Sequence, residues 1–272
     1  MKPRLSWSSI SPLITCAMVA FLMGCGDGYQ QTEDGGVEYR IHEDAGNETG
    51  EKGDVIEMEV VYEQGDTAIT NTYLKGEPVR MQLKEASYGG DIMAGLLKLG
   101  KGDSASFRLH ADSVFGDFRP MYMDGHDYVN YYLRVLDIWN EEEKIETFIR
   151  EENLDMNETE SGLRYKFLEE GEGESPEQGK LVKAHFTGKL LNGEVFEERF
   201  SRENELYEGT AGYGQPVEGW DEMVLKMNEG DKAKAIVPSE MGFREGGDEM
   251  GVPAFSPLLF EIELVEVDTP DL

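Results

Sequence analysis

Two nine-residue segments of this chain are alike. GLLKLGKGD (Gly95–Asp103) and MVLKMNEGD (Met223–Asp231) align without a gap, and the same offset pairs Phe115 with Phe243. Self-similarity at a fixed offset is the signature of a repeated structural unit. A chain of 272 residues is also long enough for two domains of ordinary size. We therefore expect two copies of one fold, each with its own core.

The second copy combines strand patterns with one helical pattern. In Phe260–Leu264 apolar residues alternate with glutamates, as in a strand with one buried face, and Ile56–Tyr62 in the first copy alternates in the same way. Asn192-Gly193 lies between two apolar pairs and predicts a tight hairpin. One stretch repeats apolar residues at i, i+3, i+4 and i+7 before Gly230, which predicts a short helix: Trp220, Met223, Val224 and Met227. The fold class expected is α+β.

The first residues have the form of an export signal. A basic head, MKPR, precedes the apolar stretch Leu13–Met23, which is too short to span a bilayer. Phe21–Cys25 resembles the lipobox of bacterial lipoproteins, in which the signal is cut before a cysteine that then carries a lipid. We expect Cys25 to be a membrane anchor in the cell envelope. Gly26 after it resembles lipoproteins sent to the outer membrane. An ordinary secretory signal with a chance cysteine is the alternative.

The distribution of polar and apolar residues predicts the domain boundaries in the rest of the chain. Residues 26–36, GDGYQQTEDGG, are polar and glycine-rich, which suits a flexible tether. Ile145, Phe148 and Ile149 recur at helical spacing among charges, so this segment is either a helix packed on a domain or a solvated spacer. The boundaries expected are a signal peptide at 1–24, a tether at 25–36, a first domain at 37–140, a helical linker at 141–160 and a second domain at 161–272.

Charge and residue counts exclude several functions. The formal net charge of −31 has the wrong sign for binding nucleic acid. Cys16 lies inside the signal, so the exported chain has no cysteine pair for a disulfide. The four histidines show no metal-ligand spacing, and the glycines form no phosphate-binding motif. No metal or cofactor is expected.

Several separated motifs of the second copy agree in order with one family. Its residues from Gly162 to Val267 resemble the FKBP-type peptidyl-prolyl cis/trans isomerases. The motifs that carry the resemblance are His185-Phe186-Thr187-Gly188, Asn192-Gly193-Glu194-Val195-Phe196-Glu197, Pro216-Val217-Glu218-Gly219-Trp220, Val237–Phe243 and Val252–Phe260.

The resemblance implies a curved antiparallel sheet wrapped around one short helix, with an apolar pocket for a proline ring between them. It places Glu197 at the polar position of the pocket and Phe243 on a flap, and it implies that Tyr207 and Pro216 contact the substrate. The remaining residues implied to line the pocket are Phe186, Phe196, Val217, Trp220, Val252 and Phe260. Without the resemblance, aromatic residues at these spacings indicate plain core.

Four positions depart from the family's usual residues. Phe186 and Phe243 replace tyrosines, Glu197 replaces an aspartate, and Arg244 stands where the flap has a glycine. A lost flap hydroxyl removes a hydrogen bond worth about 0.5–1.5 kcal/mol, so weaker catalysis is expected.

The first copy departs further, and we expect it to be catalytically inactive and to serve dimerisation, substrate capture or spacing. Ile92 occupies the position of Trp220, and a strand alignment sets Val60, Thr70 and Asn71 against Phe186, Phe196 and Glu197. Its flap, Phe115–Met123, is rich in tyrosine and methionine, which suits either a peptide-binding surface or an ordinary packed loop.

The function expected is an isomerase that assists the folding of unfolded, proline-containing exported polypeptides. The alternatives are a two-domain peptide-binding chaperone or assembly lipoprotein with weak or no isomerase activity, and a structural lipoprotein on the same scaffold. The sequence leaves the oligomeric state open.

Overall fold

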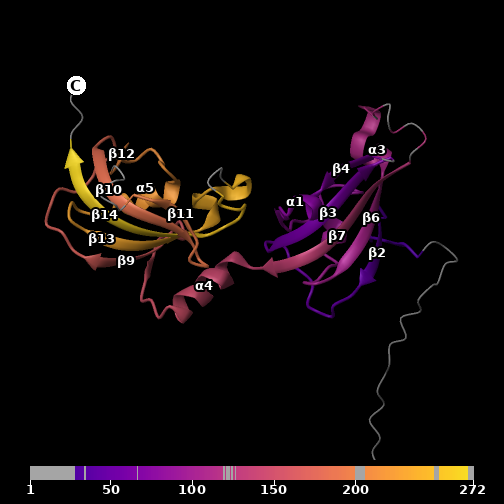
Figure 1. Ribbon diagram of the computed structural model, residues 1–272, viewed down its shortest axis with the longest axis horizontal. Helices are drawn as coiled ribbons and strands as arrows, with labels where there is room; N and C mark the ends of the chain where they lie inside the picture. Colours follow the sequence, from indigo (N-terminus) through magenta and orange to yellow (C-terminus); the bar gives the residue numbers. More distant parts are fainter. Residues whose placement is uncertain are drawn as a thin grey trace, which may run out of the picture.

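The computed structural model of the chain describes residues 28–33, 35–65, 67–118, 120, 123, 125, 127–199, 206–247 and 251–268. The expected signal peptide and Cys25 lie outside the described residues, as do Met121 and Tyr122 of the first flap. Figure 1 shows two bodies, which the helix α4 joins.

The first body is mostly strands. Its elements are β1 (Gln30–Gln31), β2 (Val37–Glu43), β3 (Val55–Gln64), β4 (Thr67–Asn71), α1 (Thr72–Lys75), β5 (Val79–Gln82), α2 (Met93–Leu96), β6 (Ser104–His110), α3 (Ala111–Phe115), a 3₁₀ turn (Gly116–Phe118) and β7 (Tyr128–Trp139).

The second body follows after one residue. Its elements are α4 (Glu141–Glu151), β8 (Asn157–Glu158), β9 (Arg164–Glu169), β10 (Leu181–Leu190), β11 (Val195–Glu198), β12 (Tyr207–Thr210), α5 (Glu218–Val224), β13 (Lys232–Val237), two 3₁₀ turns (Ser239–Met241 and Arg244–Gly246) and β14 (Leu258–Asp268).

The strands of the described residues form two seven-stranded antiparallel sheets of the same topology. The first has the order β1-β2-β6-β7-β3-β4, with β5 also paired to β3. The second has the order β8-β9-β13-β14-β10-β11, with β12 also paired to β10. Each strand of one sheet therefore has a counterpart in the other, and the α+β fold predicted from the sequence is confirmed.

The repeated motif ends in a buried aspartate in both bodies. Asp103 Oδ2 accepts a hydrogen bond from the amide of Gly100 (2.8 Å), and Asp231 Oδ2 accepts one from Asn228 (2.6 Å). The other oxygen of Asp103 accepts from the amide of Ala45 (2.8 Å). Asp231 Oδ1 makes the matching contact with the amide of Gly171. The repeat thus closes the same turn and ties down the same incoming loop in each body.

Each body has its own apolar core between its sheet and a short helix. In Figure 1, α5 lies within the curve of the second sheet. The larger buried side chains of the first core are Ile56, Met58, Leu96, Phe107, Leu133 and Val135. Those of the second are Phe186, Trp220, Met223, Val237, Phe260 and Leu264.

The flexible tether predicted for residues 25–36 is wrong in its second half. Strand β1 pairs with β2 in a hairpin, with Gln30 opposite Tyr39. Thr32 is buried and its amide donates to the carbonyl of Val37 (2.9 Å). The Tyr29 ring stacks on the Arg108 guanidinium at 3.7 Å. These contacts depend on partners distant in the sequence, which a local composition pattern does not report.

The predicted helix of the second body is present but shorter than its apolar periodicity. Helix α5 ends at Val224, whereas the pattern continues to Met227. Tight turns follow, in which the amide of Met227 donates to the carbonyl of Val224 (3.0 Å). Met227 is still buried in the core, so these turns preserve the apolar face that the sequence shows.

Segment 141–151 is a helix that packs on the second sheet. Ile145 of α4 is buried against Ile236 of β13 and Leu259 of β14. Both partners alternate with residues of the inner core, so α4 covers the face of the sheet opposite to α5. Among the described residues, none of the helices combines the length and apolarity needed to cross a membrane.

Candidate functional site

The predicted pocket residues come together on one side of the second core. The rings of Phe186, Trp220 and Phe260 are at most 1% exposed. The Phe186 ring lies edge-on to the Trp220 and Phe260 rings, each with centroids 5.8 Å away. These three aromatic residues come from β10, α5 and β14, and they form a floor.

Three partly buried aromatic residues surround this floor. Phe196 lies 5.8 Å from Phe260 and 5.9 Å from Phe243, and Tyr207 lies 4.8 Å from Trp220, all between ring centroids in edge contacts. Phe196, Tyr207 and Phe243 keep part of their surface in solvent, unlike the floor residues. The cluster therefore consists of a buried floor and a partly exposed rim.

The smaller predicted lining residues join the same cluster. Val217, the residue before α5, is 5% exposed, and Val252 is 2% exposed. Pro216 is half-buried beside Val217, and the Gln215–Pro216 peptide bond is cis. Val217 and Val252 thus belong to the same apolar cluster as the aromatic residues.

Two glycines of the motifs allow this close packing. A Cβ on Gly188 would lie 2.5 Å from the Phe196 ring and 3.1 Å from the Phe260 ring. A Cβ on Gly219 would lie 2.4 Å from Val237, so it would push α5 away from β13. Both distances are shorter than real carbon contacts, so these positions require glycine for the ring geometry of the pocket.

The charged residue of the site is already paired. Glu197 Oε1 accepts a hydrogen bond from Arg199 Nε (2.9 Å).

Burial raises the pKa of the Tyr207 phenol, and the nearby charges of Asp221 and Glu197 raise it further. The Tyr207 hydroxyl therefore stays protonated at neutral pH and available as a donor.

The flap keeps its turn although Arg244 replaces the usual glycine. Arg244 has φ of 57°, in the left-handed region that disfavours side chains. Its own side chain holds this conformation: Nε donates to the Glu240 carbonyl (2.8 Å), and Nη2 donates to Glu218 (2.8 Å). The Phe255 amide donates to the Arg244 carbonyl (2.9 Å).

Sequence reasoning missed a residue that holds the loop before α5. Asp221 in α5 is 4% exposed, and its two oxygens accept from the amides of Gly212 (2.9 Å) and Gly214 (2.6 Å). It therefore fixes the loop that brings in Pro216 and Val217. An aspartate next to the tryptophan in the first turns of a helix was the available signal.

The first body lacks a comparable cluster within its described residues. Of its aromatic side chains, Phe107 alone is fully buried in the main core. Ile92 is partly buried at the start of α2, and Asn71 caps α1 by accepting from the amide of Leu74 (3.2 Å). In the first flap, Met123 is buried against its own sheet, while Phe118 is 90% exposed.

No group of three or more histidine, cysteine, aspartate or glutamate side chains within the described part of the chain could hold a metal ion. Fold and site together define the second body as a curved-sheet domain with a cluster of aromatic side chains between its sheet and helix α5. Residues 172–265 match the family of FKBP-type peptidyl-prolyl cis-trans isomerases.

Similar proteins agree with this match. The chain is 41% identical over 106 residues to an FK506-binding protein of Neisseria meningitidis serogroup B, covering 96% of that protein and 39% of this chain. It is 36% identical over 120 residues to the FKBP-type 22 kDa peptidyl-prolyl cis-trans isomerase of Escherichia coli, covering 41% of this chain and 53% of that protein. The chain thus spans only about half of the second relative. It belongs to the FKBP-type isomerase family.

Among solved structures, the crystal structure of FkpA from Escherichia coli is similar, with a TM-score of 0.43 and 26% sequence identity. The similarity covers 47% of this chain and 60% of that one.

Proposed function

We propose that the second body catalyses cis/trans isomerisation of X-Pro peptide bonds. The observation that supports the proposal is the aromatic cluster, in which Phe186, Trp220 and Phe260 form a buried floor next to the partly exposed rings of Phe196, Tyr207 and Phe243. A proline ring fits such a site because it is small, apolar and rigid.

Isomerisation of an X-Pro bond requires a poorly hydrated binding site and no nucleophile, metal or cofactor. The planar X-Pro amide rotates over a barrier of about 18–20 kcal/mol, and the twisted transition state loses resonance and charge separation. A poorly hydrated aromatic pocket favours the twisted state over the planar one. Phe196 and Phe243 bound the open side, where the residue before proline lies when the ring is seated.

The first body is proposed to be a non-catalytic accessory. The repeat offset sets Ile92 against Trp220. Strand pairing sets Thr70 against Glu197, because Thr70 lies opposite Tyr62 of β3 as Glu197 lies opposite Gly188 of β10. The aromatic walls that the reaction uses are therefore missing at the corresponding positions.

A second candidate function is capture of unfolded chains. Leu74 and Phe118 are the most exposed of the large apolar side chains among the described residues, at 85% and 90%. Exposed apolar side chains of this kind bind apolar segments of unfolded polypeptides. In that case the aromatic cluster of the second body also binds unfolded chains, but with little isomerase turnover.

A pair of assays with residues 26–272, which are the expected exported chain without its lipid-bearing cysteine, separates the two. Isomerase activity accelerates both a short X-Pro peptide and the proline-limited phase of a refolding protein. A chaperone without isomerase activity suppresses aggregation but leaves the peptide at its uncatalysed rate, and that outcome would reject the primary proposal.

Replacing Phe243 by tyrosine is expected to raise kcat/KM for an X-Pro peptide by roughly 2–10-fold. The new hydroxyl would sit on the flap at the rim and could donate to a substrate carbonyl. The rates of wild-type protein and variant are compared at equal concentration, with Phe118→Tyr as the matched control in the first body. An unchanged or lower rate would show that the flap does not contact the substrate.

The clients are proposed to be unfolded, proline-containing exported polypeptides, met at a membrane of the cell envelope, with the outer membrane favoured. A lipid on Cys25 would hold the chain there. Cys25→Ser is therefore expected to move the protein from the membrane fraction to the soluble fraction and to abolish incorporation of a labelled fatty acid. Cys16→Ser is the control, since that residue leaves with the signal. Retention of the Cys25→Ser protein in the membrane fraction would argue against a lipid anchor.

A further inference from the structure

We propose that Glu141, the first residue of helix α4, is a positioning residue for the isomerase site. Its carboxylate accepts hydrogen bonds from Ser239, the first residue of the flap. The flap comprises residues 239–247 and contains Phe243. This inference rests on the proposed isomerase activity and adds a residue outside the segment that matches the family.

Both carboxylate oxygens of Glu141 accept hydrogen bonds from one residue of the flap. Oε1 accepts from the amide of Ser239 (2.6 Å), and Oε2 accepts from the Ser239 hydroxyl (2.8 Å). Ser239 is 1% exposed, so water does not compete for these bonds. Burial raises the pKa of the Glu141 carboxyl, and the two bonds from Ser239 offset part of that rise. A half-buried carboxylate that accepts from the amide and the hydroxyl of one residue fixes both the position and the orientation of that residue.

A tight turn connects this grip to the pocket. The Met241 amide donates to the Pro238 carbonyl, and the Gly242 amide donates to the Ser239 carbonyl, each at 3.0 Å. Phe243 follows at once, with its ring edge-on to Phe196 at 5.9 Å. A displacement of Ser239 is therefore passed on to the Phe243 ring through a chain segment with few free torsions.

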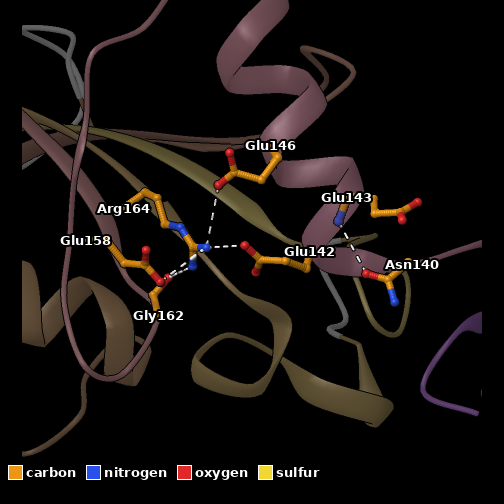
Figure 2. Close-up of polar contacts among 7 residues, drawn as sticks. All are labelled: Asn140, Glu142, Glu143, Glu146, Glu158, Gly162 and Arg164. Atoms are coloured by element: carbon orange, nitrogen blue, oxygen red, sulfur yellow. Dashed lines mark hydrogen bonds and ion pairs between the residues drawn. The ribbon is translucent and has the colours of Figure 1, made fainter.

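Helix α4 is itself a fixed support, independent of Glu141. Figure 2 shows the Arg164 guanidinium between the helix and the second body, with Glu142 and Glu146 on one side and Glu158 on the other. Arg164 Nη1 also donates to the Gly162 carbonyl (2.6 Å), and its side chain is 6% exposed. With Ile145 buried below, the helix cannot shift without breaking these contacts.

Helix α4 also begins close to the first body, because only Asn140 separates it from the last strand of that body. Asn140 separates Trp139 of β7 from Glu141, and its Oδ1 caps α4 by accepting from the amide of Glu143 (3.3 Å), as seen in Figure 2. Its Nδ2 donates to Asp54 of the first body (3.2 Å). Ser239 of the flap is thereby connected, through Glu141 and Asn140, to the junction between the two bodies.

A merely structural role for Glu141 predicts lower stability without a specific effect on Phe243. The test therefore uses a double-mutant cycle in the exported chain, with Glu141→Ala, Phe243→Ala and both together. We expect Glu141→Ala to lower kcat/KM for an X-Pro peptide roughly 2–10-fold. In the Phe243→Ala background the same change should have little further effect, because Glu141 acts through the flap. Exchange of the Ser239 amide should speed up.

Two variants complete the design. Glu141→Gln should restore most of the activity, because its amide group can accept from the Ser239 amide and donate to the Ser239 hydroxyl. Glu146→Ala is the matched control: it loses a contact of the same helix with Arg164 (3.6 Å) but none with the flap, and it should keep wild-type kcat/KM.

Several results would overturn the inference while the wild-type chain is active. They are an unchanged rate for Glu141→Ala, an equal loss in the Phe243→Ala background, or the same loss for Glu146→Ala. An inactive wild-type chain would instead reject the proposed function, and the inference with it. Thermal unfolding of each variant establishes that the second body is folded at the assay temperature.

Discussion

Asp231→Ala is expected to lower the free energy of unfolding of the second body by about 3–5 kcal/mol. Its carboxylate is 2% exposed and accepts from two backbone amides, those of Gly171 and Asn228. Bonds to a charged group contribute about 1.5–3 kcal/mol each, and alanine leaves both amides buried without an acceptor. Urea unfolding followed by amide signals from each body measures the loss.

The chain contains a matched control for this change. Asp103→Ala removes the corresponding contacts to Gly100 and Ala45 in the first body. If the repeat forms two separate cores, Asp103→Ala destabilises the first body and spares the second, and Asp231→Ala does the reverse. Equal destabilisation of both bodies by either variant would contradict two independent cores.

Trp220→Leu is expected to lower kcat/KM for an X-Pro peptide by at least about tenfold, which is 1.4 kcal/mol of transition-state stabilisation. The indole is 1% exposed and lies against both Phe186 and Tyr207. Leucine keeps an apolar floor but loses the flat aromatic surface under the proline ring. Steady-state rates, with substrate binding measured separately, test this expectation.

Leucine is preferred to alanine because the pocket floor must remain filled. Removing a buried tryptophan down to alanine costs about 3–5 kcal/mol, which could unfold the body and hide the effect on catalysis. The Nε1–H of Trp220 has no acceptor among the described residues, so its removal breaks no hydrogen bond within them. Met227→Leu, in the same core but outside the aromatic cluster, is the control and should keep wild-type activity. A similar loss in both variants would mean that general core packing, and not the floor, governs the rate.

The second body could be predicted from sequence because its signals are local. Alternation in Phe260–Leu264 gives part of β14, and the helical spacing around Trp220 gives α5. The motif glycines, Gly188 and Gly219, explain why the aromatic rings can pack closely, and the family resemblance indicated which rings belong to one cluster. Asparagine and glycine at 192–193 lie in the predicted turn, where Gly193 has φ of 89° and its amide donates to Leu190.

Contacts between distant segments could not be predicted in this way. The grip of Glu141 on Ser239 joins residues 98 apart in sequence, and an acidic segment such as Glu141–Glu143 looks like solvated surface. Tyr29 likewise orders the segment expected to be a tether only because Arg108 lies beside it. Periodicity reports which face of an element is buried, but not which partner covers it.

We propose that the aromatic cluster of the second body isomerises X-Pro bonds. The most direct test is one assay of cis-to-trans conversion of an X-Pro peptide by three forms of residues 26–272: wild type, Asp103→Ala and Trp220→Leu. We expect acceleration by wild type and by Asp103→Ala, and a rate at least about tenfold lower for Trp220→Leu. No acceleration by the wild-type chain, or equal acceleration by all three forms, would contradict the proposal.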